Sequence, residues 1–139
     1  MVNNNKIRQK LDGLQKNIAF LESMSQMSID EFVMDPRNYL SAIRILQISV
    51  EAMIDIANHI IAQKGLGVPQ TYHDSIKILT KEGYLPQDKE TIFRAMIRFR
   101  NRAVHMYDEI DEKEIYRIIR EHLGDYQDFV DSIIKRCLI

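Results

Sequence analysis

Residues 36–64 read PRNYLSAIRILQISVEAMIDIANHIIAQK, and this stretch decides the fold. Asp35 and Pro36 predict an N-cap and a first-turn proline, and Gly65 predicts the end of the helix. The predicted helix is apolar on most of its sides, at Leu40, Ile43, Ile45, Leu46, Ile48, Val50, Met53, Ile54, Ile56, Ile60 and Ile61. A helix that is apolar all round must be buried on all sides.

Two arrangements would bury such a helix. The other helices of the same chain can wrap it, or part of it can face a second copy of the chain across a two-fold axis. In a chain of 139 residues, one bundle can hardly cover the whole helix. We therefore expect a homodimer.

Four further helices and one short helical turn follow from apolar spacing, capping residues, glycines and prolines. They are expected at about residues 5–25, 28–34 (the short turn), 73–82, 86 to 106 or 107, and 111–137. Gly124 is a candidate for a kink in the last of these. The pattern predicts an all-α, up-and-down bundle of about five helices, forming one domain over residues 1–139.

Composition excludes several classes of protein. The N-terminal residues contain no apolar segment, and the longest apolar run, residues 18–21, is far too short to cross a membrane. The single cysteine, Cys137, cannot form an internal disulfide, which fits the cytoplasm. A net charge of −1 argues against a broad nucleic-acid-binding surface. No glycine-rich phosphate loop and no metal-ligand spacing of histidines is present, so neither a cofactor nor a metal is expected.

The helix expected from residue 86 is strongly basic near its end. Four arginines fall within nine residues that contain no acid: Arg94, Arg98, Arg100 and Arg102. Cations are favourable near a helix C-terminus. This explains why the charges are positive, but not which way each arginine side chain points. At 100° per residue, one side of the helix carries Arg94, Arg98, Asn101, Arg102 and His105. The three outer arginines are candidates for weak contacts with RNA phosphates.

Arg100 points elsewhere, because its neighbours three and four residues away are all apolar. A guanidinium in such a setting loses hydration and needs a compensating partner. One interpretation is an ion pair with Glu51 or Asp55, on a polar stripe of the long helix. The other is a phosphate gripped by the guanidinium in a cleft.

His105 has two interpretations as well. A histidine near the end of a basic helix is often a surface or capping residue. However, Asn101 lies one turn earlier on the same face and can orient the imidazole or contact the same ligand. A neutral histidine can deprotonate a ribose 2′-hydroxyl while Arg100 stabilises charge on phosphorus. An arginine, an amide and a neutral histidine on one helical segment are parts that RNA cleavage without a metal needs.

The segment FRNRAVHMYDEID, residues 99–111, resembles the signature of the HEPN superfamily, and more narrowly that of HepT-type toxins of MNT–HEPN toxin–antitoxin modules. The family motif is Arg, four residues, His, one residue, Tyr, which Arg100, His105 and Tyr107 meet here. Asn101 is the polar residue usual after the arginine. Residues 55–62 and the order of the helices agree with the resemblance.

The resemblance implies an α-helical homodimer whose two Arg100–His105 pairs form a composite cleft that cuts RNA without a metal. It also implies a partner, a minimal nucleotidyltransferase antitoxin that transfers AMP from ATP to Tyr107 and so neutralises the toxin. The alternative is a non-catalytic HEPN module that binds a nucleotide or RNA, or serves as a scaffold for a nucleotidyltransferase.

Overall fold

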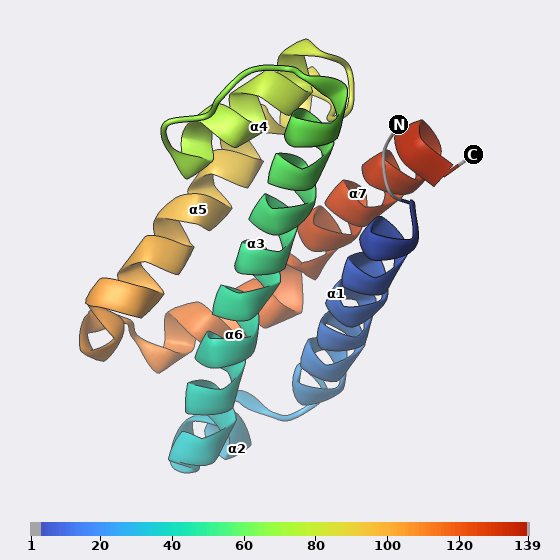
Figure 1. The fold of residues 1–139 in the computed structure, drawn as a ribbon. Helices are drawn as coiled ribbons and strands as arrows, with labels where there is room; N and C mark the ends of the chain where they lie inside the picture. Colours follow the sequence, from blue (N-terminus) through green and yellow to red (C-terminus); the bar gives the residue numbers. More distant parts are fainter. Residues whose placement is uncertain (1–3, 139) are drawn as a thin grey trace.

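The computed structural model describes residues 4–138 and contains no strand within them (Figure 1). Its α-helices are α1 (Asn4–Met24), α2 (Ile29–Met34), α3 (Pro36–Lys64), α4 (Tyr72–Lys81), α5 (Glu90–His105), α6 (Glu112–Glu121) and α7 (Leu123–Ile133). Two short 3-10 turns, Gln87–Lys89 and Tyr107–Glu109, flank α5, and a π-helical turn, Ile134–Leu138, follows α7. The all-α bundle is confirmed. Residues 1–3 and 139 of the predicted domain lie outside the described part.

α3 is the central helix of the bundle. It packs on α1, α2, α4, α5 and α6, and Figure 1 shows it between α5 and α1. Eight of its eleven predicted apolar positions are buried, Ile45 and Ile48 are partly buried, and only Leu40 is exposed, at 49%. The expectation that one bundle cannot cover this helix is therefore wrong. A homodimer has to be argued from other features of the molecule.

The predicted caps fix the ends of the long helix. The Asp35 carboxylate accepts a hydrogen bond from the backbone N–H of Arg37, and Pro36 occupies the first turn. Gly65 ends the helix with φ 61° and ψ 42°, a left-handed conformation that glycine adopts without a steric penalty. Ser28 caps the short α2 by accepting from the N–H of Glu31.

The last predicted helix, residues 111–137, is two helices. Asp111 caps α6 as expected, but α6 ends at Glu121 and α7 begins at Leu123. The break is at His122, two residues before the predicted kink at Gly124. It allows both segments to bury their apolar faces, with Ile115 and Ile119 on α6 and Tyr126 and Phe129 among those on α7.

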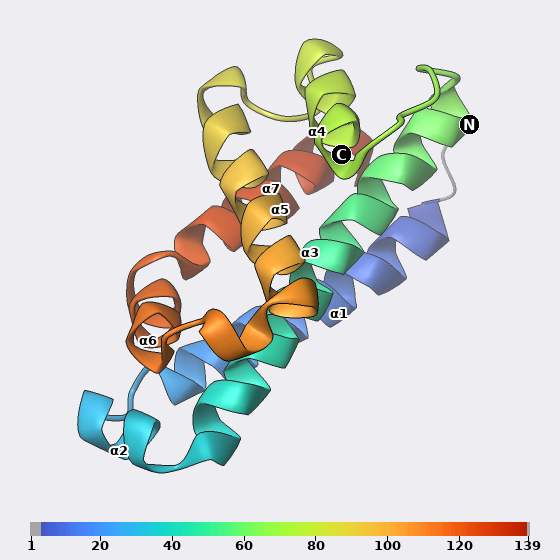
Figure 2. The same cartoon turned by 90° about the vertical axis from the view of Figure 1, so that its left-hand side faces the viewer.

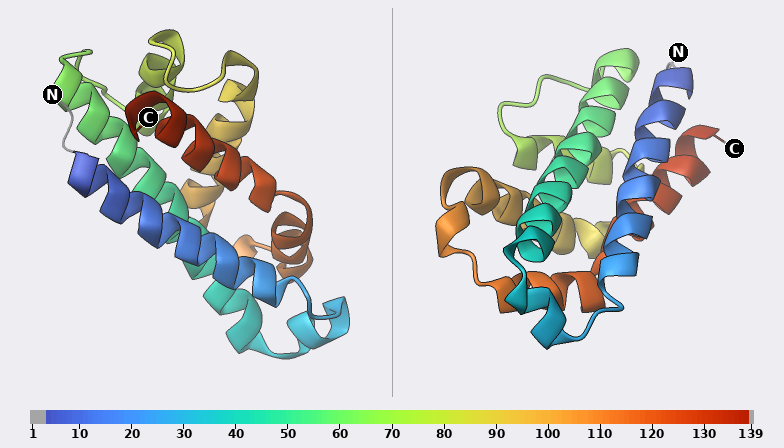
Figure 3. Two further views of the ribbon diagram at one scale, coloured as in Figure 1. Left: turned by 90° about the vertical axis from the view of Figure 1, so that its right-hand side faces the viewer. Right: turned by 90° about the horizontal axis from the view of Figure 1, so that it is seen from below.

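The helices divide the bundle into two ends. α4 lies at the same end as the chain termini, and α2 lies at the other (Figures 1 and 2). α1 runs along α3 with α7 packed next to it (Figure 3), so α5 is left on the opposite side of α3. No helix within residues 4–138 has the length and apolar character needed to cross a membrane. The C-terminal half of α5, where the candidate residues lie, thus packs on α3 with its inner side. On its outer side, Arg98, Val104 and His105 are exposed.

Candidate active site

Arg100 turns inward from α5 toward α3. Its side chain is 17% exposed, and its Nε donates a hydrogen bond of 2.9 Å to Oε2 of Glu51. Asp55, the other predicted partner, instead pairs with Lys10 of α1 at 3.4 Å. The ion-pair interpretation of Arg100 is therefore confirmed, with Glu51 as the partner.

Three more side chains surround this pair. The Arg100 Nη1 donates to Oδ1 of Asn101 at 3.2 Å, and the guanidinium lies 5.2 Å from the centre of the Tyr72 ring. Gln47 donates to the same Glu51 oxygen at 3.1 Å. Asn101 was expected to orient the imidazole of His105 or to contact the same ligand. In the structure, its Oδ1 accepts a hydrogen bond from Arg100. The part played by Tyr72, in the first turn of α4, was not foreseen.

His105 is the last residue of α5 and is exposed. The next backbone N–H, that of Met106, donates to the carbonyl of Arg102 at 2.7 Å and closes the helix. Tyr107 then begins the 3-10 turn, with 59% of its surface exposed. The helix was predicted to continue to residue 106 or 107. That continuation is wrong, because Met106 leaves the helical conformation.

Two of the three arginines on the outer side of α5 form ion pairs that their positions on the helix did not indicate. Arg102 donates from Nη1 and Nη2 to the two carboxylate oxygens of Glu114 on α6, at 2.8 and 3.0 Å, and this bonding raises its pKa. Arg94 pairs with Glu90 one turn earlier, at 3.3 Å. Arg98 is exposed. The bonds from Arg102 to Glu114 thus join α5 to α6.

A second histidine lies close to this basic surface. Burial lowers the pKa of His73 on α4, and the positive charges of Arg94 and Arg98 lower it further. Its Nδ1 is buried without a hydrogen-bond partner among residues 4–138. α4 therefore brings the His73 imidazole and the Tyr72 ring alongside the arginines of α5.

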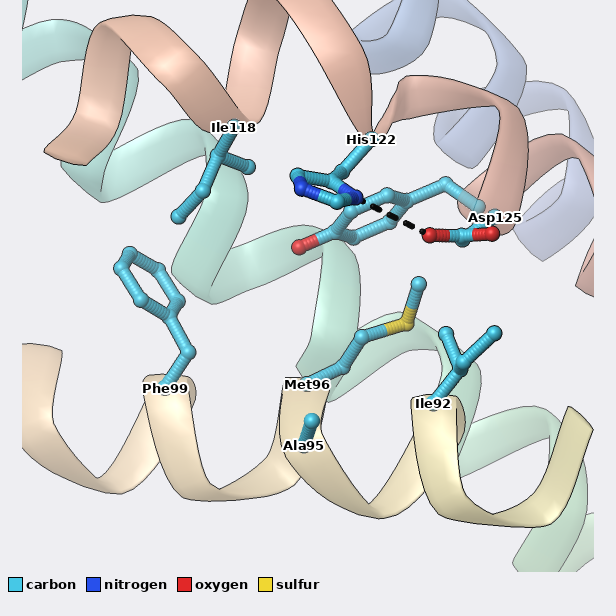
Figure 4. Close-up of a pocket in the computed structure, with 8 residues that line it drawn as sticks. Ile92, Ala95, Met96, Phe99, Ile118, His122 and Asp125 are labelled. Atoms are coloured by element: carbon cyan, nitrogen blue, oxygen red, sulfur yellow. Dashed lines mark ion pairs between the residues drawn. The ribbon is translucent and has the colours of Figure 1, made fainter.

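The opposite flank of α5 borders an apolar cavity of about 290 Å³ against α6 and α7 (Figure 4). Phe99 and Met96 line it from α5, and Ile118 lines it from α6. At its edge, His122 Nδ1 lies 3.5 Å from a carboxylate oxygen of Asp125. The cavity lies between α5 and α6–α7, whereas Arg100 makes its ion pair with α3 and its aromatic contact with α4. The polar residues of the predicted motif are thus on the α3–α4 flank or at the end of α5.

The described residues include no group of three or more histidine, cysteine, aspartate or glutamate side chains arranged to hold a metal ion. The acidic residues near Arg100 are distributed among ion pairs. Glu51 holds Arg100, Asp55 holds Lys10, and Glu114 holds Arg102. Each of these three carboxylates therefore already neutralises a neighbouring cation.

Comparison with protein families identifies the family of this chain. The model of the ribonuclease HepT-like family matches residues 14–133, which include every helix that contacts α5. The chain belongs to the HepT-like ribonuclease family. The assignment confirms the resemblance and identifies the fold as that of a family of RNA-cleaving enzymes.

Two curated HepT nucleases are similar to the chain. One is the mRNA nuclease HepT of Shewanella oneidensis, 39% identical over 93 residues, which are 67% of this chain and 70% of that protein. The other is the tRNA nuclease HepT of Aphanizomenon flos-aquae, 27% identical over 127 residues, which are 91% of this chain and 86% of that protein. The two relatives differ in the RNA that their names give.

Solved structures show the same fold. A tri-AMPylated HEPN toxin of Shewanella oneidensis in complex with its MNT antitoxin has a TM-score of 0.85 and 32% identity, over 93% of this chain and 96% of that one. YutE of Bacillus subtilis, described as a cytosolic protein of unknown function, has a TM-score of 0.84 and 25% identity, over 97% of this chain and 90% of that one. The helical architecture is thus shared along nearly the whole chain.

Proposed function

We propose that this protein is the toxin of a toxin–antitoxin module and cuts RNA at Arg100 and His105 without a metal ion. The observation that carries the proposal is the arrangement at the end of α5, where a fixed guanidinium and an exposed imidazole lie five residues apart. The family assignment, and relatives that are named as nucleases, support it.

In the proposed reaction, His105 takes the proton from a ribose 2′-hydroxyl. The 2′-oxygen then bonds to the adjacent phosphorus, the bond from phosphorus to the 5′-oxygen breaks, and the departing oxygen takes up a proton. Arg100 stabilises the negative charge that builds on the phosphoryl oxygens. The products are a 2′,3′-cyclic phosphate and a 5′-hydroxyl. Exposed Arg98 contacts a flanking phosphate, while Arg94 and Arg102 contribute less because Glu90 and Glu114 engage them.

The active unit in this proposal is a homodimer with the two α5 ends facing each other. Two exposed apolar side chains lie directly beside His105: Val104 at 36% and Met106 at 44%. Clustered exposed apolar groups are typical of interaction surfaces. Pairing of two copies here would form the composite cleft from two Arg100–His105 pairs.

The proposed antitoxin is a minimal nucleotidyltransferase. In its reaction the Tyr107 oxygen bonds to the α-phosphorus of ATP, pyrophosphate leaves, and the phenolic proton is released. The tyrosine is accessible to such a partner, since it is 59% exposed on a turn outside the helix. The AMP phosphate would lie two residues from His105, where it repels RNA phosphate and blocks access to the imidazole.

The dimer predicts a mass in solution. Light scattering coupled to size-exclusion chromatography should give twice the 16.4 kDa of one chain at micromolar concentration. Met106→Glu should shift the mass toward the monomer, because it places a charge in the apolar contact. Val68→Glu is the control, as Val68 is an exposed apolar residue (81%) in the α3–α4 connection. A wild-type protein with the mass of a single chain would contradict the dimer.

Loss of either motif side chain should abolish cleavage. Arg100→Ala should slow RNA cleavage by about 100–1000-fold and His105→Ala by about 100–10,000-fold, as for the removal of a charge-stabilising group and a general base. The assay contains a chelator, and circular dichroism checks that the helices persist. Arg102→Ala should lose much less, and Arg117→Ala, an exposed arginine of α6, should lose nothing. Near wild-type cleavage by either motif variant would contradict the assignment of Arg100 and His105, whereas a wild-type chain that does not cut RNA would favour the non-catalytic binding module.

Tyr107→Phe separates regulation from catalysis, because it removes only the hydroxyl. The variant should fold and cut RNA, but neither gain mass nor lose activity when it is incubated with the nucleotidyltransferase and ATP. Wild-type protein treated in parallel should gain AMP units by mass spectrometry and lose cleavage. If the Phe variant still gains AMP and is still silenced, another residue is the acceptor.

A further inference from the structure

Glu51 occupies an unusual position for an acidic residue of an RNA-binding site. It projects from the middle of α3, with its side chain 32% exposed, and its Oε2 accepts both from Arg100 at 2.9 Å and from Gln47 at 3.1 Å. Gln47 lies one helical turn before it, so the carboxylate is itself held in place. A negative charge here works against the binding of phosphate, and its presence needs an explanation.

The contacts of Arg100 indicate what Glu51 does. Glu51 binds the guanidinium at Nε, Asn101 binds it at Nη1, and the Tyr72 ring covers one face at 5.2 Å. Nη2 makes no hydrogen bond to any of residues 4–138. A guanidinium is a rigid planar fork, so fixing Nε and one face also fixes the direction of both terminal nitrogens.

We infer that Glu51 is a positioning residue for RNA cleavage, which orients Arg100 so that its Nη edge meets the phosphate at the moment of reaction. This inference rests on the proposed function of the same site. The bond through Nε leaves Nη2 for substrate, whereas a bidentate pair, like that of Arg102 with Glu114, occupies both terminal nitrogens. Glu51 therefore weakens the attraction of the site for RNA but improves its geometry.

The two effects have opposite signs, and this gives the inference a distinctive signature. Removing the negative charge should strengthen binding of RNA, since a nearby like charge is lost. Removing the hydrogen bond should slow turnover, because small displacements of a catalytic group reduce rates by up to about 100-fold. A purely structural ion pair would alter thermal stability and would leave both kinetic parameters unchanged in the folded protein.

The experiment compares Glu51→Ala and Glu51→Gln with the wild-type chain in steady-state cleavage of an RNA oligonucleotide. Glu51→Ala should lower kcat by about 10–100-fold while KM falls or stays the same. Glu51→Gln keeps an oxygen acceptor and the shape of the side chain, so it should restore most of kcat. Asp55→Asn is the matched control, because Asp55 lies one turn further along α3 and pairs with Lys10. It should behave like the wild type.

A binding measurement keeps the inference separate from the proposed reaction. A 2′-O-methyl oligonucleotide cannot be cut at its ribose, and its affinity for Glu51→Gln should exceed that for the wild type by roughly fivefold at low salt. If the wild-type chain does not cut RNA, the proposed function fails, while this comparison still tests how Glu51 acts on Arg100. Unchanged affinity and kcat in both Glu51 variants, or a higher KM with unchanged kcat, would overturn the positioning role.

Discussion

The pair between Arg100 and Glu51 is the interaction on which the site depends. The flanking residues of α5 give Arg100 an apolar setting, in which Met96, Ile97 and Ala103 are buried. Removing one partner of a fully buried ion pair costs about 3–5 kcal/mol, whereas a fully exposed pair contributes about 0–1 kcal/mol. Side-chain exposures of 17% and 32% place this pair between the two limits. The pair therefore helps to join α5 to α3, and it also holds the inward-pointing side chain of Arg100 in place.

The other helices contact α5 on two sides. On one flank, α3 and α4 supply polar and aromatic partners, namely Glu51 and Tyr72. On the other, α6 and α7 supply apolar packing and the bridge from Glu114 to Arg102. Because both flanks are occupied, the end of α5 presents His105 and Tyr107 outward. The end of α5 is therefore the part of the helix that other molecules can reach.

Features that follow from local chemistry could be predicted from the sequence. Capping at Asp35, Ser28 and Asp111, and the left-handed end at Gly65, depend on residues adjacent to the helix termini. The need of Arg100 for a partner followed from its apolar neighbours, and Glu51 was one of two candidates. The family could also be recognised from the motif, and the match over residues 14–133 confirmed that resemblance, while the site residues taken from the motif stay a prediction.

Features that depend on tertiary contacts could not be predicted in this way. The break at His122 replaces a continuous helix because α6 packs on α2 and α3 as well as on α1, whereas α7 packs mainly on α1. Tyr72 reaches Arg100 from α4, and no periodicity within α5 indicates that contact. The coverage of α3 was underestimated, because the count of helices says little about how closely they wrap. Similarly, the end of α5 at His105 was placed one or two residues too late.

The chemistry of the RNA ends tests the central claim most directly. Attack by a 2′-oxygen leaves a 2′,3′-cyclic phosphate, and this product does not form when water attacks the phosphorus. Mass spectrometry of fragments produced by the purified chain with excess chelator should show 2′,3′-cyclic phosphate and 5′-hydroxyl ends, and a fully 2′-O-methylated RNA should remain intact. Fragments that carry 3′-hydroxyl and 5′-phosphate ends, or cleavage of the methylated RNA, would contradict the assignment of Arg100 and His105 to this reaction.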